Sequence, residues 1–207
     1  MTTDASPITL RGWALILGAS SGFGAATSLA LARAGLDVFG VHLDRKSTLP
    51  NVERLAVEIR QRLAGAYPLV LAVMGGAVVF AGQILPRLRF PLDFDYIHAS
   101  RYGAGTRGAQ IEWRVTPPPG VKERDVLVLD DILDGGETMA AIRQRLLELG
   151  AKSFHCAVLV EKRLNVEKPI RADFVGLQIA DRFVFGCGMD AKGFWRNLPE
   201  IRAMKDG

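Results

Sequence analysis

The densest group of chemically active residues lies in VLVLDDILDGGET, residues 126–138. An apolar run typical of a buried strand leads into three acids, Asp130, Asp131 and Asp134. Carboxylates this close repel each other unless a cation or hydrogen-bond donors lie among them. The stretch therefore predicts a binding site at the end of a strand.

The residues after the acids suit an anion. Gly135 and Gly136 allow backbone N–H groups to face a concavity, and a helix beginning near Glu137 adds its positive N-terminal end, with the hydroxyl of Thr138 beside it. A sugar phosphate meets both demands, with hydroxyls for the acids and a phosphate for the loop, and a divalent metal would also fit. The simpler interpretation, a capped helix with exposed acids, needs only one acid.

The surrounding pattern predicts an α/β fold, a parallel sheet flanked by helices. In such a sheet, ligands bind beyond the carboxyl ends of the strands, where the acid cluster falls. The polar stretch 101–123 is predicted to be a mobile lid or a loose hairpin. The expected strands are 13–18, 37–44, 68–76, 92–99, 126–130 and 154–162, and the expected helices are 21–35, 51–66, 77–88 and 137–149.

Composition restricts the class of protein. The 207 residues are 49% apolar and 23% charged, a globular balance. The net charge of +4 is scattered, which suits a basic surface or a polyphosphate cleft and argues against nucleic acid as a partner. No apolar run is long enough to span a membrane, and Cys156 and Cys187 are expected to be buried free thiols. These features predict a cytoplasmic protein.

VLVLDDILDGGET closely resembles the phosphoribosyl-diphosphate (PRPP) motif of type I phosphoribosyltransferases. The tail ADFVGLQIADRFVFGCGMDAKGFWRNLP is similar to the C-terminal hood of the hypoxanthine-guanine members. The resemblance covers about residues 51–207, with the hood at about 170–207. It implies a Mg²⁺-dependent purine salvage enzyme that joins a 6-oxopurine to PRPP, releasing pyrophosphate, and that forms a homodimer or homotetramer.

The resemblance also implies roles for individual residues. Asp134 is the candidate general base. The residues implied for PRPP are Asp130, Asp131, Gly135, Gly136, Glu137, Thr138, Gly75, Gly76 and Arg196. Those implied for the purine are Lys162, Phe183, Val184 and Asp190, and those implied for the metal are Asp130, Asp131 and Asp190. A mobile loop beginning at Ser100 would close over the reacting centre.

Two positions depart from the family pattern. Gly75 stands where the family commonly has a lysine, and Gly135 stands where it has a threonine. Each change removes a contact to an anionic oxygen, so weaker PRPP binding is the resulting hypothesis.

A second glycine-rich turn, GASSGFG, precedes these motifs. Gly18, Gly22 and Gly24 lie between a strand and a helix, and Asp44 ends the next strand, which suits an adenine dinucleotide such as NAD(P). Residues 8–50 resemble the first βαβ unit of short-chain dehydrogenases. Hydride transfer in that family needs a tyrosine with a lysine four positions on. Here Tyr67, Tyr96 and Tyr102 are followed at that spacing by Leu71, Ser100 and Thr106.

Residues 1–50 are therefore expected to form an incomplete Rossmann-like βαβ segment and residues 51–207 a phosphoribosyltransferase domain. Three interpretations of the first segment stay open: an extra layer on the transferase, a dinucleotide half-site, or a chimera of two families. For the whole chain, the first hypothesis is a transferase. The alternatives are a non-catalytic protein that binds PRPP, another nucleotide or NAD(P), and an inactive fusion.

Overall fold

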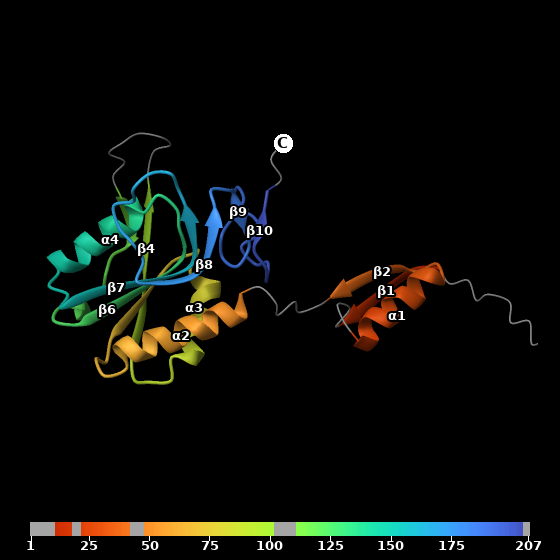
Figure 1. Ribbon diagram of the computed structural model, residues 1–207, viewed down its shortest axis with the longest axis horizontal. Coiled ribbons are helices and arrows are strands. Elements are labelled where there is room, and N and C mark those ends of the chain that lie inside the picture. Colours follow the sequence, from red (N-terminus) through yellow and green to blue (C-terminus); the bar gives the residue numbers. More distant parts are fainter. Residues whose placement is uncertain (1–10, 18–21, 42–47, 102–110, 205–207) are drawn as a thin grey trace, which may run out of the picture. The chain divides into compact units, whose positions relative to one another are not determined.

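The computed structural model describes residues 11–17, 22–41, 48–101 and 111–204 (Figure 1). The chain divides into two compact units, Met1–Arg45 and Lys46–Gly207.

The first unit contains a strand, a helix and a strand. These are β1 (Trp13–Leu17), α1 (Gly22–Arg33) and β2 (Asp37–Val41). β1 and β2 pair in parallel in a two-stranded sheet, with Trp13 opposite Asp37. Gly18 and Asp44, predicted to contact a dinucleotide, lie outside the described residues. Dinucleotide binding therefore stays a prediction.

The second unit is built on a six-stranded sheet. The strand order is β5 (Ile111–Val115), β4 (Asp93–Arg101), β3 (Leu69–Val73), β6 (Asp125–Leu133), β7 (Ser153–Arg163) and β8 (Phe174–Ala180). Only the β4–β5 pair is antiparallel among these neighbours. The predicted α/β class with a flanked, mainly parallel sheet is confirmed. β5 lies in the stretch for which a lid or hairpin was expected, and residues 102–110 lie outside the described ranges.

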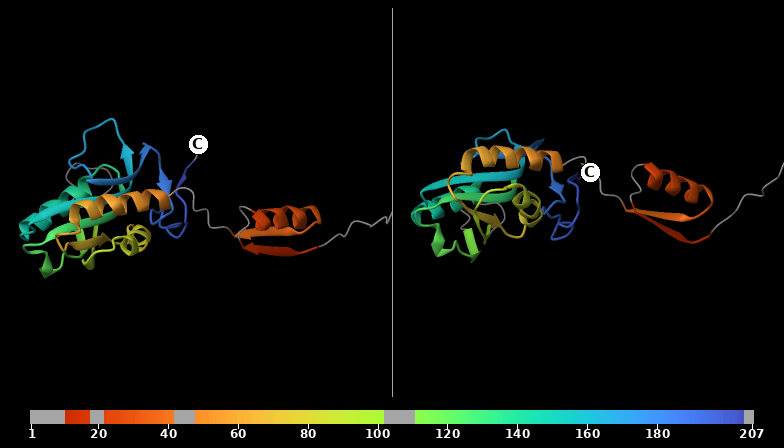
Figure 2. Two further views of the ribbon diagram at one scale, coloured as in Figure 1. Left: turned by 60° about the horizontal axis from the view of Figure 1, so that its bottom comes forward. Right: turned by 90° about the horizontal axis from the view of Figure 1, so that it is seen from below.

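Helices cover both faces of this sheet (Figures 1 and 2). α2 (Leu49–Leu63) and α3 (Val78–Ile84) pack on one face, and α4 (Glu137–Glu148) packs on the other. Successive residues of β6 alternate between the two cores, with Leu127 and Leu129 in one and Val126 and Val128 in the other. Burial on both faces explains why this strand reads as an unbroken apolar run. Short 3₁₀ turns follow α3 at Leu85–Arg87 and precede β6 at Pro119–Val121.

Helix α2 begins earlier than the sequence indicated. Asn51 was the expected first residue, whereas the helix starts at Leu49 with Thr48 at its N-cap. Pro50 is in the first turn, where the missing N–H costs nothing and the fixed φ suits a helix. Pro50 therefore lies within the helix.

After β8 the chain forms a small hood. Its strands β9 (Val184–Phe185) and β10 (Arg202–Ala203) pair antiparallel. No helix within the described ranges is long and apolar enough to cross a membrane.

The order of the strands sets the position of the site. From β3 the chain moves to β4 and β5 on one side, then returns to β6 on the other side of β3. The carboxyl ends of β3 and β6 therefore flank a topological switch point, where open α/β sheets bind ligands.

The burial of both cysteines leads to a prediction. Cys156 and Cys187 are free and fully buried, and burial raises the pKa of the Cys156 thiol to about 12. Since the thiolate is the reactive form, a thiol reagent should modify neither residue in the native protein and both after denaturation. Mass spectrometry after a short exposure to iodoacetamide measures this. Rapid native labelling of either cysteine would contradict the packing.

Candidate active site

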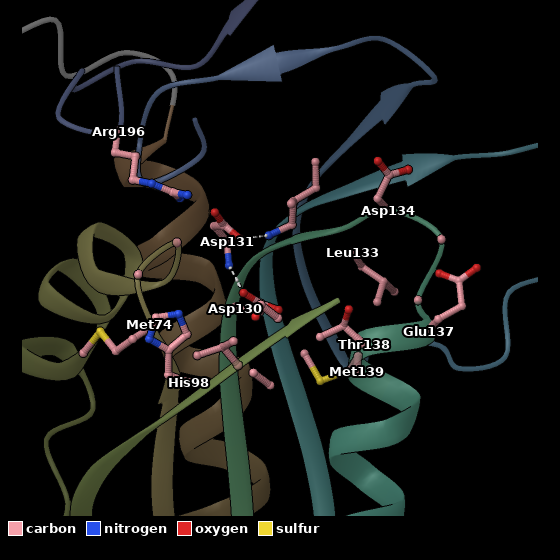
Figure 3. A pocket seen from close by; sticks show the side chains of 18 residues that line it. Met74, His98, Asp130, Asp131, Leu133, Asp134, Glu137, Thr138, Met139 and Arg196 are labelled. Carbon is pink, nitrogen blue, oxygen red and sulfur yellow. Dashed lines mark hydrogen bonds between the residues drawn. The ribbon is translucent and has the colours of Figure 1, made fainter. Parts of the chain in front are cut away.

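A cavity of about 390 Å³ opens at the switch point (Figure 3). Its wall combines the carboxyl ends of β3, β4 and β6 with the start of α4 and one residue from the hood. The lining residues of Figure 3 include Met74, His98, Asp130, Asp131, Asp134, Glu137, Thr138 and Arg196, and the turns at Gly75–Gly76 and Gly135–Gly136 complete the wall. Segments far apart in the sequence thus meet at one cavity, and all of them belong to the second unit.

The acid pair stands at the centre of the cavity. Asp131 is 8% exposed, and its backbone N–H donates to Asp130 Oδ1 at 2.9 Å. Burial, together with the neighbouring charge of Asp131, raises the pKa of Asp130 well above its ordinary value. Burial also raises the pKa of Asp131, although the nearby Arg196 opposes this shift. Arg196 compensates for this burial only in part, so the site favours further hydroxyl donors or a cation.

Glycines let the acid pair, the β3 turn and the hood come together. A Cβ on Gly76 would collide with the carboxylate of Asp131, and a Cβ on Gly188 would collide with the carbonyl oxygen of Gly76. Gly188 also has a φ of +105°, which favours glycine. Its carbonyl accepts a hydrogen bond from Arg196 Nη1 at 2.7 Å. This hydrogen bond joins two residues of the hood: Arg196, which lines the cavity, and Gly188, which lies against the Gly76 turn.

The glycine loop after β6 closes the opposite wall. Gly136 takes a φ of +91° as the N-cap of α4, and its carbonyl accepts the first helical hydrogen bond, from the N–H of Ala140 at 2.9 Å. The positive end of α4 therefore faces the cavity with Glu137 and Thr138 on its first turn. This wall can bind an anion.

Asp134 forms an ion pair with a lysine from the neighbouring strand. Lys162 Nζ lies 2.7 Å from Asp134 Oδ2 and 3.8 Å from Asp181 Oδ1. The lysine side chain is 11% exposed, whereas that of Asp134 is 53% exposed. The pair thus presents a carboxylate to solvent beside a buried ammonium. A flat molecule with an adjacent N–H and carbonyl matches these two groups.

Lys162 itself does not line this cavity, although its partner Asp134 does. The other residues predicted to contact the purine lie in the hood and do not line it either. Phe183 is 51% exposed, and Val184 is part of the β9–β10 ladder. Asp190 pairs with Arg196 Nη2 at 2.5 Å and accepts the N–H of Gly193 at 2.7 Å. The Asp190 carboxylate is therefore already bound within the hood, by Arg196 and by the N–H of Gly193.

The predicted metal set includes Asp130, Asp131 and Asp190. The described part of the chain has no group of three or more acidic, histidine or cysteine side chains that could hold a metal ion. Asp190 is instead neutralised by its arginine partner. The acid pair alone suits Mg²⁺, which usually binds one or two carboxylates and takes its other ligands from substrate phosphates and water.

His98 was missed at the sequence level. It follows Ile97 on β4 and lines the cavity beside Met74 (Figure 3). Of the described lining residues, His98 and Arg196 are the ones that can carry positive charge. The position of His98 at the end of a predicted strand was the available signal. Ser100, where the loop was expected to begin, also lines the cavity, and the rest of that loop lies outside the described residues.

The fold and the cavity define a sugar-phosphate-binding α/β protein, and the comparisons give its family. The model of the phosphoribosyl transferase domain matches residues 43–192, and the chain belongs to this family. It is 29% identical over 170 residues to the hypoxanthine-guanine phosphoribosyltransferase of Bacillus subtilis, covering 82% of this chain and 94% of that protein. The corresponding protein of Staphylococcus epidermidis RP62A is also 29% identical, with coverage of 80% and 97%.

Solved structures agree with these relatives. A hypoxanthine-guanine phosphoribosyltransferase from Bacillus anthracis, with a HEPES molecule in its active site, has a TM-score of 0.70 and 28% identity. The alignment covers 76% of this chain and 94% of that chain. A hypoxanthine phosphoribosyltransferase from Staphylococcus aureus has a TM-score of 0.67 and 28% identity, covering 76% and 89%. The predicted resemblance to the hypoxanthine-guanine members is confirmed, whereas the resemblance to dehydrogenases stays a prediction.

The buried acid pair predicts an unusual dependence of stability on pH. Both carboxyls have a higher pKa in the folded protein than the ordinary value of 3.8. Their contribution to stability is therefore fully present below pH 3.8 and is lost as the pH rises through the raised pKa values. Asp130→Asn should therefore increase the free energy of unfolding of the ligand-free protein at pH 7.5 and flatten its slope with pH.

Urea denaturation between pH 5 and pH 8 measures this, with Glu112→Gln, an exposed carboxylate on β5, as the control. Equal slopes of the unfolding free energy against pH for wild type and Asp130→Asn would show that burial of the acid pair does not lower the stability of the fold.

Proposed function

We propose that this protein is a purine salvage phosphoribosyltransferase that joins hypoxanthine or guanine to PRPP, giving the nucleoside monophosphate and pyrophosphate. One observation carries the proposal: a buried acid pair, an anion-binding helix start and an Asp–Lys pair occur together at the switch point of a phosphoribosyl transferase fold. Each part corresponds to one part of the two substrates.

The sugar phosphate fits the centre of the cavity. Asp130 and Asp131 would accept hydrogen bonds from the two ribose hydroxyls, and these donors would stabilise the charged carboxylates, whose burial raises both pKa values. The loop Gly135–Thr138 at the start of α4 would bind the 5′-phosphate.

The pyrophosphate fits the side of the cavity formed by the Gly75–Gly76 turn and Arg196. The Arg196 guanidinium would stabilise the charge that develops as pyrophosphate leaves. Mg²⁺ held by the acid pair and the substrate would neutralise part of the same charge.

The purine fits beside Asp134 and Lys162. Lys162 would donate to the 6-oxo group, Phe183 would stack on the base, and Val184 would offer its backbone to the edge of the base. The bond between C1′ and the pyrophosphate oxygen breaks as the purine nitrogen bonds to C1′, and Asp134 takes the proton from N7. Pyrophosphate leaves with the bonding electrons. Because Lys162 lies 2.7 Å from it, the Asp134 carboxylate is held in reach of that proton.

We further propose that the predicted residues 51–207, together with Leu49 and Pro50 of the first turn of α2, form the catalytic domain, with the hood at about 170–207. We also propose that the protein is cytoplasmic and that the enzyme is a homodimer or homotetramer. Every described residue that lines the cavity falls between Val73 and Arg196, which supports this assignment of the catalytic part. The segment 1–50 is a Rossmann-like βαβ unit in this proposal, and its use of NAD(P) stays a prediction.

The role of Asp134 is tested by Asp134→Asn. Nucleotide formation from PRPP and Mg²⁺ is measured with hypoxanthine, guanine, xanthine and adenine in turn. We expect turnover with hypoxanthine and guanine, and a drop of about 100-fold in kcat for the variant, because a positioned general base contributes roughly 10²–10⁴-fold. A folded wild-type sample without turnover would overturn the proposed function, and an unimpaired variant would overturn the role of Asp134.

The missing lysine at Gly75 gives a second test. A Cβ at this position meets nothing within 4 Å, so a longer side chain has space. Gly75→Lys should lower the KM for PRPP by about tenfold or more, since a charge-assisted hydrogen bond is worth roughly 1.5–3 kcal/mol. Gly75→Met, of similar length and without charge, is the matched control. Equal KM values for wild type and Gly75→Lys would refute the weaker binding inferred for glycine.

A further inference from the structure

An interior lysine outside the cavity carries an additional inference. Lys168 lies in the connection between β7 and β8, and its side chain is only 10% exposed. Its Nζ donates to the carbonyl oxygen of Leu133 at 3.0 Å and to that of Lys162 at 2.6 Å. Glu161 Oε1 lies 3.5 Å from the same nitrogen. These three oxygens match the three donors of an ammonium.

The two carbonyls belong to the segments that carry the Asp–Lys pair. Leu133 directly precedes Asp134 in the chain, and Lys162 is itself the partner of Asp134. The Lys168 ammonium therefore bridges the backbone of Lys162 and the backbone of Leu133, the residue before Asp134.

This link lies where the two strands separate. In the ladder between β6 and β7, the last pair is Leu133 opposite Glu161. Beyond it the chain after β6 turns into the glycine loop, and no further pair of that ladder holds Asp134. The Lys168 ammonium thus adds a bridge at the point where the regular hydrogen bonds end.

We propose that Lys168 is a positioning residue that sets the separation of Asp134 and Lys162, and through it the affinity for the purine base. The inference rests on the proposed transferase function. Burying an ammonium is costly compared with burying an apolar side chain, so stability alone is a weak reason for a lysine at this position.

The stem of Lys168 has a separate packing role. A Cβ on Gly136 would lie 3.6 Å from Lys168 Cβ and 3.5 Å from Pro169 Cδ, so this segment lies behind the glycine turn of the phosphate loop. Lys168→Met keeps the Cβ and the apolar stem and removes the ammonium. It therefore tests the charge without removing the support of the loop.

Steady-state kinetics of Lys168→Met, with each substrate varied in turn, test the proposal. We expect the KM for hypoxanthine to rise about tenfold or more and kcat to fall about tenfold, because small displacements of reacting groups are costly in rate. The KM for PRPP should stay within about twofold of wild type, since the acid pair and the phosphate loop keep their contacts.

Two further variants separate positioning from stability. Lys152→Met removes an ammonium that pairs with Asp125 at 2.9 Å and precedes the first residue of β7, at the other end of that strand, and it should leave both KM values unchanged. Glu161→Gln combined with Lys168→Met removes the carboxylate left without its cation. This double variant should regain thermal stability relative to Lys168→Met while the KM for hypoxanthine stays high.

Three outcomes would overturn the inference. The first is a Lys168→Met protein whose KM values for hypoxanthine and PRPP change by the same factor. The second is recovery of the hypoxanthine KM together with stability in the double variant. Either result would make Lys168 a structural residue alone and leave the transferase standing. The third is a wild-type protein that forms no nucleotide, which would overturn the proposed function and the positioning role with it.

Discussion

The second unit depends on one constraint: two adjacent carboxylates, Asp130 and Asp131, lie near the carboxyl end of a strand that is buried on both faces. β6 places Leu127 and Leu129 in one core and Val126 and Val128 in the other, and its next residues are acids. Only Ile132 and Leu133 follow these acids in the strand. The loop, the helix start and the hood surround these acids, and Gly76 has no side chain because the Asp131 carboxylate takes that space.

The acids near the site differ in whether they have an ion-pair partner, and this difference indicates where a ligand binds. Asp134 pairs with Lys162, Glu161 with Lys168, and Asp190 with Arg196. Asp130 and Asp131 form no ion pair with a described residue, and burial raises the pKa of both carboxyls, although the charge of Arg196 opposes the shift at Asp131. Donors or positive charge from a ligand would stabilise the two buried carboxylates, so this position suits a substrate.

Local patterns in the sequence predicted much of this arrangement. The acid cluster, the glycine loop and α4 are contiguous in the chain, so periodicity and turn chemistry were sufficient to place them. The contact between Asp134 and Lys162 spans 28 residues and depends on the register of β6 with β7, which bottom-up reading of residue types does not give. Only the family resemblance had placed Lys162 near the base.

Other features were not predicted from the sequence because they depend on the three-dimensional fold. Lys168 reads as an ordinary surface lysine until the carbonyls around it are known. Asp190 reads as a free acid until the fold of the hood brings Arg196 beside it. Pro50 reads as a break, although its ring is compatible with the first turn of α2.

The contact of Gly188 with the carbonyl of Gly76 concerns main-chain atoms only. The attachment of the hood therefore does not depend on which side chains the hood presents to a base. Phe183, which is 51% exposed, can be exchanged for the residue of a transferase with another base preference while this backbone contact is kept, whereas Val184 also packs against the core. The second unit thus offers a scaffold on which base selectivity can be engineered separately from sugar-phosphate binding.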